Sequence, residues 1–173
     1  MKLVLIGYMG SGKSSVGRLL SQSLSYSFID LDNWIAASEG VTISKLFLKK
    51  GELYFRKKEA SSLSTILSEN NNLVLSTGGG TPCYGTVMDD LNQTNEVVTI
   101  YLKNDLETLT QRLFKEKDTR PLISHLESEV AVNDFIRKHL FERSYYYNQA
   151  DVILDCTDKT PREIVEKIIV TLF

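Results

Sequence analysis

The stretch that decides the fold is LVLIGYMGSGKSSVGRLL, residues 3–20. Its apolar start predicts a buried strand over Leu3–Ile6, and the spacing of Val16, Leu19 and Leu20 predicts an amphipathic helix that begins at Lys13. The turn between them, residues 7–14, matches the pattern G-x-x-x-x-G-K-[ST]. A glycine-rich turn that binds nothing is the alternative interpretation. A strand before the pattern and a helix after it favour a phosphate-binding loop.

The chemistry of such a loop follows from its residue types. Glycines allow successive backbone N–H groups to point towards one anion, and the helix that follows presents its positive end. Lys13 is expected to reach the β- and γ-phosphates, and the Ser14 hydroxyl to ligate Mg²⁺. The predicted ATP-binding residues of this stretch are Gly10, Ser11, Gly12, Lys13, Ser14 and Ser15.

Short apolar runs alternate with amphipathic stretches along the remaining chain. This alternation predicts one α/β domain over residues 1–173, built on a parallel sheet. The other expected strands are Ser27–Asp30, Leu73–Ser76, Val97–Leu102 and Val152–Leu154. The last helix is expected after Thr160, because Thr160-Pro161-Arg162-Glu163 is a capping box with proline at the first helical position.

Two segments interrupt the alternation. Residues 33–70 have a helical pattern and are much longer than the dozen or so residues that a crossover needs. Residues 115–124 are polar and charged around Arg120 and Pro121, as in many active-site lids. We therefore expect an insert and a lid on the two sides of one site.

Composition excludes several classes of protein. The net charge is −2 and the basic residues are scattered, which argues against nucleic acid as the main partner. The first apolar run is broken at Gly7 and followed by Lys13, so a signal peptide is not expected, and no stretch is long enough to span a membrane. Cys83 and Cys156 are too few for a disulfide framework, and a reduced, cytoplasmic chain is the simpler interpretation.

Two carboxylates, Asp30 and Asp32, end the second predicted strand. Residues two apart on a strand point the same way, so both can face the crevice where open α/β sheets bind ligands. Asp30 is a candidate to hold Mg²⁺ through water, and Asp32 to hold a substrate hydroxyl. The alternative is a solvated turn in which Asp32 is the N-cap of the next helix. Neither His125 nor His139 lies in a motif, so neither is assigned a role.

Further motifs follow in order: Gly51-Glu52-x-x-Phe55-Arg56-x-x-Glu59, Thr77-Gly78-Gly79-Gly80, Thr119-Arg120-Pro121-Leu122, Glu142-Arg143 with Tyr147, and Ala150-Asp151. Together with the phosphate-binding loop and the two aspartates, they resemble the shikimate kinase family from Leu3 to about Asp151. The resemblance implies a P-loop kinase fold with strand order 2-3-1-4-5, a helical substrate-binding insert and a lid. It also implies ATP-dependent phosphorylation of the 3-hydroxyl of shikimate, on the route to chorismate and the aromatic amino acids, by a monomeric Mg²⁺-dependent enzyme.

The resemblance assigns the remaining site residues. Arg56 and Arg143 are expected to bind the substrate carboxylate, which suits the planar fork of arginine. Gly78, Gly79 and Gly80 are expected to let the backbone approach the substrate, and Asp32 to accept hydrogen bonds from ring hydroxyls and act as base. Arg120 resembles the arginine of the lid that binds the transferred phosphate, and Arg112 the arginine that stacks on adenine.

Other interpretations stay open at this stage. Each arginine has an alternative as a solvated or ion-paired surface residue. A gluconate or nucleoside-monophosphate kinase of similar build is a second enzyme hypothesis, and an ATP-binding module without transfer is a third. The family usually has proline soon after the second substrate arginine, whereas Ser144 and Tyr145 follow Arg143 here, so we expect a less sharply bent helix.

Overall fold

The computed structural model describes all of residues 1–173. Its strands, α-helices and two short 3₁₀ helices follow in the order β1 (Lys2–Ile6), α1 (Lys13–Leu24), β2 (Ser27–Asp30), α2 (Leu31–Glu39), α3 (Ile43–Glu69), β3 (Leu73–Ser76), η1 (Thr81–Cys83), α4 (Val87–Gln93), β4 (Val97–Lys103), α5 (Leu106–Lys115), η2 (Lys117–Thr119), α6 (Glu129–Tyr147), β5 (Val152–Asp155) and α7 (Pro161–Leu172). Every strand expected from the sequence is present, with bounds that differ by one residue at most.

The five strands form one parallel sheet in the order β2-β3-β1-β4-β5, which confirms the expected order. β1 is central and pairs with β3 on one side and with β4 on the other. Residues 3–6 of β1 are completely buried, because helices cover both faces of the sheet. This is why the strand is a continuous apolar run without alternation.

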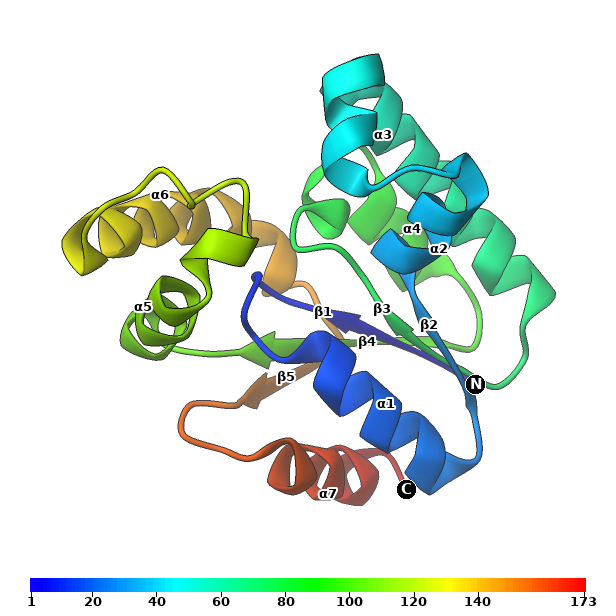
Figure 1. Cartoon of the computed structure of the whole chain (residues 1–173). Helices are drawn as coiled ribbons and strands as arrows, with labels where there is room; N and C mark the ends of the chain where they lie inside the picture. The colour runs from blue at the N-terminus through cyan, green and yellow to red at the C-terminus, as the bar shows by residue number, and fades with distance from the viewer.

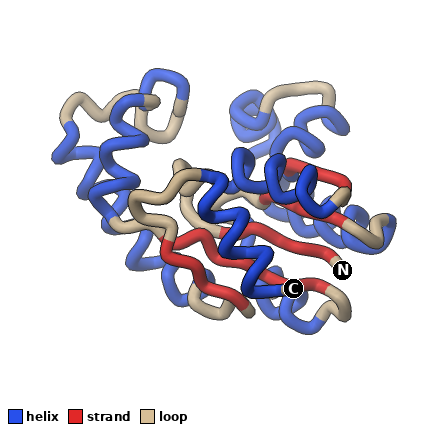
Figure 2. The backbone as a smooth tube through the Cα atoms, turned by 90° about the horizontal axis from the view of Figure 1, so that it is seen from below, coloured by secondary structure: helices blue, strands red, loops and turns tan.

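The helices lie in two layers, one on each face of the sheet (Figures 1 and 2). On one face, α1 and α7 cover a core that includes Leu5, Leu20 and Ile168. On the other face, a larger core joins α3, α4, α5 and α6 to the sheet. α7 begins as expected, since the Thr160 hydroxyl accepts from the Glu163 N–H and the Glu163 carboxylate accepts from the Thr160 N–H.

The insert between β2 and β3 contains two helices, and the sequence misplaced its start. α2 begins at Leu31, and its N-cap is Asp30, whose carboxylate accepts from the Asn33 N–H. The alternative interpretation in which Asp32 is the N-cap is therefore wrong, because the strand runs directly into the helix without a turn. α3 is bent at Gly51, where the backbone has φ 78°. This bend separates a short outer helix from the longer part that carries Arg56.

The segment expected as a lid links α5 to α6. It lies at the carboxyl edge of the sheet, across from the insert that contains α2 and α3 (Figure 1). Residues 115–124 contain the end of α5, the short η2 and a turn stabilised by backbone bonds from the Ile123 and Ser124 N–H groups to the Arg120 carbonyl. α6 continues without interruption through Ser144, where the family usually has a proline nearby. No helix in the structure combines the length and apolarity needed to cross a bilayer.

Candidate active site

The glycine-rich loop after β1 has the geometry of an anion-binding nest. Gly12 precedes α1 with φ 91°, a left-handed conformation that disfavours residues with a Cβ. The Lys13 ammonium folds back over the loop and donates to the carbonyls of Gly7 and Tyr8, at 2.7 and 2.8 Å. Lys13 is buried, and this burial lowers the pKa of its ammonium group to about 8. The loop therefore places a desolvated lysine at the positive end of a helix.

A cavity of about 270 Å³ opens above this loop. Its lining contains most residues predicted to bind ATP and metal: Gly10, Gly12, Lys13, Ser14, Ser15, Asp30 and Arg120. Three residues predicted to bind the substrate, Asp32, Gly78 and Gly79, also line it, together with Met9, Thr77 and Glu116. Only one of these side chains is apolar. The lining suits a highly charged ligand such as a polyphosphate.

Two oxygen groups in this cavity fit a hard cation. The Ser14 hydroxyl donates to the Asp30 carboxylate with 2.6 Å between the oxygens, and the Ser76 hydroxyl lies 3.4 Å from Ser14 Oγ. No cluster of three or more histidine, cysteine or acidic side chains occurs in the structure. One hydroxyl and one carboxylate fit Mg²⁺, which keeps several waters and takes its other ligands from phosphates.

A second cavity of about 280 Å³ lies between the insert, the triple glycine and the expected lid. It is lined by Met9, Asp32, Ile43, Phe47, Phe55, Arg56, Glu59, Gly78, Gly79, Gly80, Thr119, Arg120, Pro121, Leu122 and Arg143. Apolar side chains from the insert and the lid share this cavity with three arginines and two carboxylates. Five residues line both cavities: Met9, Asp32, Gly78, Gly79 and Arg120. The two cavities therefore adjoin, with Asp32 and Arg120 at their common boundary.

Arg56 is held on several sides at the second cavity. Its guanidinium donates to the buried Glu59 carboxylate at 2.6 Å and lies 3.4 Å from Glu52. The guanidinium carbon also lies 3.9 Å from the centroid of the Tyr84 ring, within range of a cation–π interaction. A Cβ at Gly80 would approach Arg56 Nη1 to 2.9 Å, so glycine is required there for Arg56 to occupy this position.

Arg143 lines the same cavity from α6, which is far from Arg56 in the sequence. Its guanidinium carbon lies 5.5 Å from the centroid of the Tyr8 ring. One turn later, the Tyr147 hydroxyl donates a hydrogen bond to the Gly79 carbonyl, which ties α6 to the triple glycine. The structure thus brings together the two arginines that the sequence predicted as a pair.

Asp32 has an unusual protonation equilibrium for a carboxyl group. Burial, followed by the charges of Glu59 and Asp30, raises the pKa of Asp32 from 3.8 to about 6, although Lys13 and Arg56 act in the opposite direction. A carboxylate with this pKa is ionised at neutral pH and is a better proton acceptor than an ordinary aspartate.

Arg120 is held by a carboxylate that the sequence did not single out. Its Nε and Nη2 groups donate to Glu116 Oε2, at 3.0 and 2.6 Å. Glu116 lies four residues earlier and lines the first cavity with Arg120. The four-residue spacing at the end of a helix is the signal that could have identified this pair.

Two predicted ATP-binding residues lie outside the cavity lining. Ser11 is a buried residue of the loop, and its hydroxyl lies 3.5 Å from the Lys13 ammonium. Arg112 donates to the Gly10 carbonyl and to Asn104 Oδ1, at 3.3 and 3.2 Å. It therefore supports the loop from its outer side, and a role in stacking on adenine stays a prediction.

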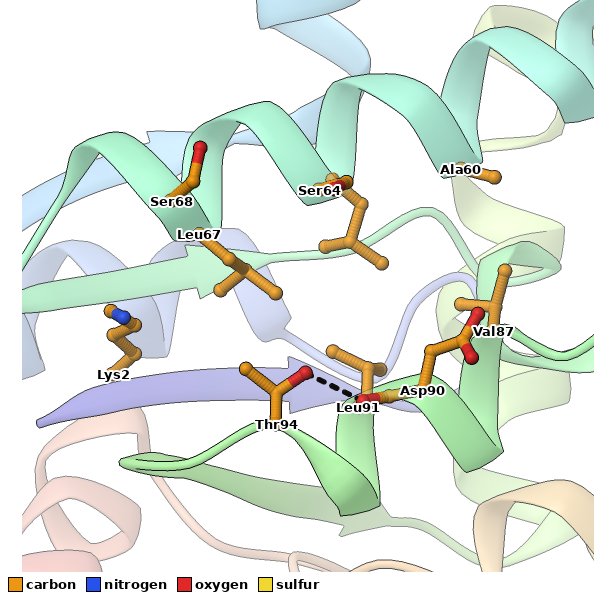
Figure 3. A pocket seen from close by; sticks show the side chains of 10 residues that line it. Lys2, Ala60, Ser64, Leu67, Ser68, Val87, Asp90, Leu91 and Thr94 are labelled. Atoms are coloured by element: carbon orange, nitrogen blue, oxygen red, sulfur yellow. Dashed lines mark hydrogen bonds between the residues drawn. The ribbon is translucent and has the colours of Figure 1, made fainter.

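A third cavity, of about 350 Å³, lies away from this site between α3 and α4 (Figure 3). Leu67 and Leu91 face each other across it, and the Thr94 hydroxyl at its edge donates to the Asp90 carbonyl. None of the residues predicted to bind ATP, metal or substrate lines this cavity.

Comparisons with known proteins show similarity over nearly the whole chain. The family model described as shikimate kinase matches residues 9–173. A shikimate kinase of Flavobacterium psychrophilum is 41% identical over 172 residues, which cover 99% of each chain. The crystal structure of a shikimate kinase from Bacteroides thetaiotaomicron superposes with a TM-score of 0.91 at 32% identity, covering 99% of this chain and 98% of that one. A shikimate kinase from Acinetobacter baumannii, solved in complex with shikimate, has a TM-score of 0.86 at 32% identity, with 99% and 92% covered.

Proposed function

Because this chain belongs to the shikimate kinase family, we propose that its two adjoining cavities hold ATP and shikimate, and that the γ-phosphoryl group passes to the 3-hydroxyl between them. The chain is accordingly a kinase of aromatic amino-acid biosynthesis. The observation that carries the proposed arrangement is the common boundary of the cavities. Asp32 and Arg120 line both of them, as a reacting centre requires.

Recognition of the acid is assigned to Arg56 and Arg143. Both line the second cavity, and two guanidinium groups can bind one carboxylate through charge-assisted hydrogen bonds. Apolar contacts from Phe47 and Phe55 would cover the cyclohexene ring. Gly78, Gly79 and Gly80 line the same cavity, and a Cβ on Gly79 would come within 3.1 Å of the Met9 nitrogen. Glycine at position 79 therefore lets the triple glycine pack closely against the phosphate-binding loop.

The transfer itself is assigned to Asp32 as proton acceptor. The oxygen of the 3-hydroxyl forms a bond to the γ-phosphorus, and the bond between that phosphorus and the β–γ bridging oxygen breaks. The hydroxyl proton moves to the Asp32 carboxylate, and ADP leaves with the bridging oxygen. A pKa near 6 leaves Asp32 ionised before the reaction and able to accept this proton during it.

Lys13 and Arg120 are assigned the role of stabilising the negative charge on the transferring phosphoryl group. Both line the first cavity, and such fixed positive charges stabilise phosphoryl transfer mainly by electrostatics. Lys13 would exchange its contacts with loop carbonyls for phosphate oxygens, and Arg120 would exchange Glu116 for the γ-phosphate. Ser14 and Asp30, the latter through water, would hold Mg²⁺, which neutralises phosphate charge when bound.

Residues 33–70 are proposed as the substrate-binding insert and residues 115–124 as the lid. The lid contributes Thr119, Pro121 and Leu122 to the second cavity, where they would exclude water from the reaction. A single domain, a monomeric state and a cytoplasmic location stay predictions. Light scattering coupled to size-exclusion chromatography measures the monomeric state directly.

The proposal is tested by a coupled assay for ADP release with a panel of acceptors. Shikimate is expected to support turnover, whereas gluconate and nucleoside monophosphates are not. NMR of the product should place the phosphate on the 3-hydroxyl. Turnover of gluconate or a nucleotide with shikimate inert, or ATP binding without any transfer, would reject the proposal.

A further inference from the structure

Tyr8 is the second residue of the phosphate-binding loop, and its side chain is only 1% exposed. Its hydroxyl lies 3.0 Å from Nδ1 of His139, a residue 131 positions later on α6. A buried phenolic hydroxyl needs a partner, because an unsatisfied one is costly. Tyr8 is thus the only residue of the loop whose side chain forms a hydrogen bond with α6, and His139 is its partner.

The ring of Tyr8 also contacts the acid-binding region. Arg143 lies one helical turn after His139, and its guanidinium carbon lies 5.5 Å from the centroid of the Tyr8 ring. No carboxylate lies within ion-pair distance of Arg143, whereas Arg56 is held by Glu59 and Glu52. Arg143 therefore has no ion pair to fix its position, and Tyr8 is the aromatic ring within cation–π range of its guanidinium.

Tyr8 contacts the ATP side through its backbone. Its carbonyl accepts from the Lys13 ammonium at 2.8 Å and from the Ser11 N–H at 3.2 Å. One residue therefore contacts the proposed phosphate-binding lysine through its main chain and a proposed acid-binding arginine through its ring.

The charges around His139 favour a neutral ring that accepts this hydrogen bond. Burial and the nearby Arg143 lower the pKa of His139, and burial raises the pKa of Tyr8. The Tyr8 hydroxyl has no other hydrogen-bond partner, so we assign the tautomer with the proton on Nε2, in which the hydroxyl donates and Nδ1 accepts. Phe135 packs edge-on against the imidazole, with 4.3 Å between the ring centroids, and fixes its orientation.

We propose that Tyr8 and His139 are positioning residues that set the place of the Arg143 guanidinium relative to the phosphate-binding loop. The pair acts through Arg143 and touches neither reacting atom. This inference rests on the proposed function, in which Arg143 binds the carboxylate of shikimate. Tyr8 and His139 belong to different elements, and neither the sequence motifs nor their spacing connects the two residues.

The test compares Tyr8→Phe, His139→Leu and His139→Asn. Tyr8→Phe keeps the ring and the carbonyl but removes the hydroxyl, and His139→Leu removes the acceptor. Each is expected to raise the KM and the Kd for shikimate about five- to tenfold, the effect of losing one hydrogen bond. The change in KM for ATP or in kcat should be smaller. His139→Asn keeps an acceptor near the position of Nδ1 and should restore most of the affinity.

Matched controls are Tyr145→Phe and His125→Leu, since both residues are exposed and lie outside the two cavities. Neither control should change the affinity for shikimate. The double variant Tyr8→Phe/His139→Leu should be no worse than either single variant, because all three lack the same bond. Thermal melts report any general loss of stability.

Unchanged shikimate affinity in Tyr8→Phe and His139→Leu would overturn the inference. Equal losses for shikimate and ATP would also overturn it, since they indicate a structural role alone. The Kd for shikimate is measured by calorimetry without turnover, so the inference is tested even if transfer fails. A wild-type chain that binds shikimate tightly but does not phosphorylate it would reject the proposed function alone, whereas one that does not bind shikimate would reject both.

Discussion

The Ser14 hydroxyl donates a hydrogen bond to the Asp30 carboxylate, with 2.6 Å between Oγ and Oδ2. This bond joins the first turn of α1 to the end of β2. The other Asp30 oxygen accepts from the Asn33 N–H and caps α2. Asp30 therefore has a structural role at one oxygen and a proposed metal-binding role at the other.

The two roles of Asp30 can be separated by substitution. Asp30→Asn keeps a good N-cap but removes the charge, so we expect the Mg²⁺ concentration for half-maximal activity to rise about tenfold with little change in Tm. Asp30→Ala should lose the cap as well and unfold with about 1 kcal/mol less free energy. Activity titrations with Mg²⁺ and thermal melts measure both. An unchanged Mg²⁺ requirement in both variants would remove Asp30 from the metal site.

Lys13 is expected to be essential for transfer but not for folding. Lys13→Ala removes a buried positive charge that faces the phosphates, and kcat should fall on the order of 10²–10³-fold or more. The fold should persist, because the ammonium contacts only carbonyls and a hydroxyl of its own loop. Steady-state kinetics and circular dichroism test this expectation. Near-normal turnover in a folded variant would contradict the role given to the loop.

Arg56 is expected to affect the acid much more than the nucleotide. Arg56→Ala should raise the KM for shikimate roughly 100-fold, the loss of a charge-assisted bidentate contact, while the KM for ATP changes little. Because the substitution also leaves the buried Glu59 without its cation, Arg56→Ala/Glu59→Gln is the control for that cost. If the KM values for both substrates rise together, Arg56 is structural.

Activity is expected to fall as the pH drops through about 6, where Asp32 takes up a proton and loses its ability to act as base. The contribution of Asp32 to the free energy of unfolding changes in the opposite direction, since it becomes less favourable as the pH rises. A raised carboxyl pKa means that ionisation of Asp32 is costly in the folded state, so this cost is absent below pH 3.8 and complete above about pH 6. Asp32→Asn should therefore be inactive yet more stable than the wild type by at most about 3 kcal/mol at pH 7.

The pH dependence of that stability difference is the control. Denaturant unfolding of both proteins at pH 4 and pH 7 should give nearly equal free energies at the lower pH and a gain for Asp32→Asn at the higher one. A constant difference at both pH values would show that the stabilisation does not come from the carboxyl charge.

Glu116 is expected to compete with ATP for Arg120. Glu116→Gln removes the carboxylate that accepts both Arg120 bonds, so the KM for ATP should fall about two- to fivefold. Asp118→Asn removes another acidic charge from the same segment, at a side chain that is 88% exposed, and should change little. An equal decrease in both variants would indicate a general effect of charge rather than release of Arg120.

Local patterns in the sequence predicted the scaffold closely. Strand bounds, the start of α1 and the capping box of α7 depend on residue spacing and on backbone hydrogen bonding within a few residues, which the sequence displays directly. The alternative that the sequence left open, Asp32 as N-cap, is wrong at a point where a strand passes into a helix without a turn. Asp30 and Asp32 lie two residues apart, and the point at which the strand ends decides which of them caps the helix.

The sequence by itself determined a phosphate-binding loop between a buried strand and a helix, because that chemistry needs only consecutive residues. The pairing of Arg56 with Arg143 came from the family pattern, and only tertiary packing on the sheet brings their side chains to one cavity. Contacts such as Tyr8 with His139 were decided by the tertiary structure alone. They depend on how α6 packs against the loop that follows β1, and no periodicity or motif in the sequence predicts contacts between residues so far apart along the chain.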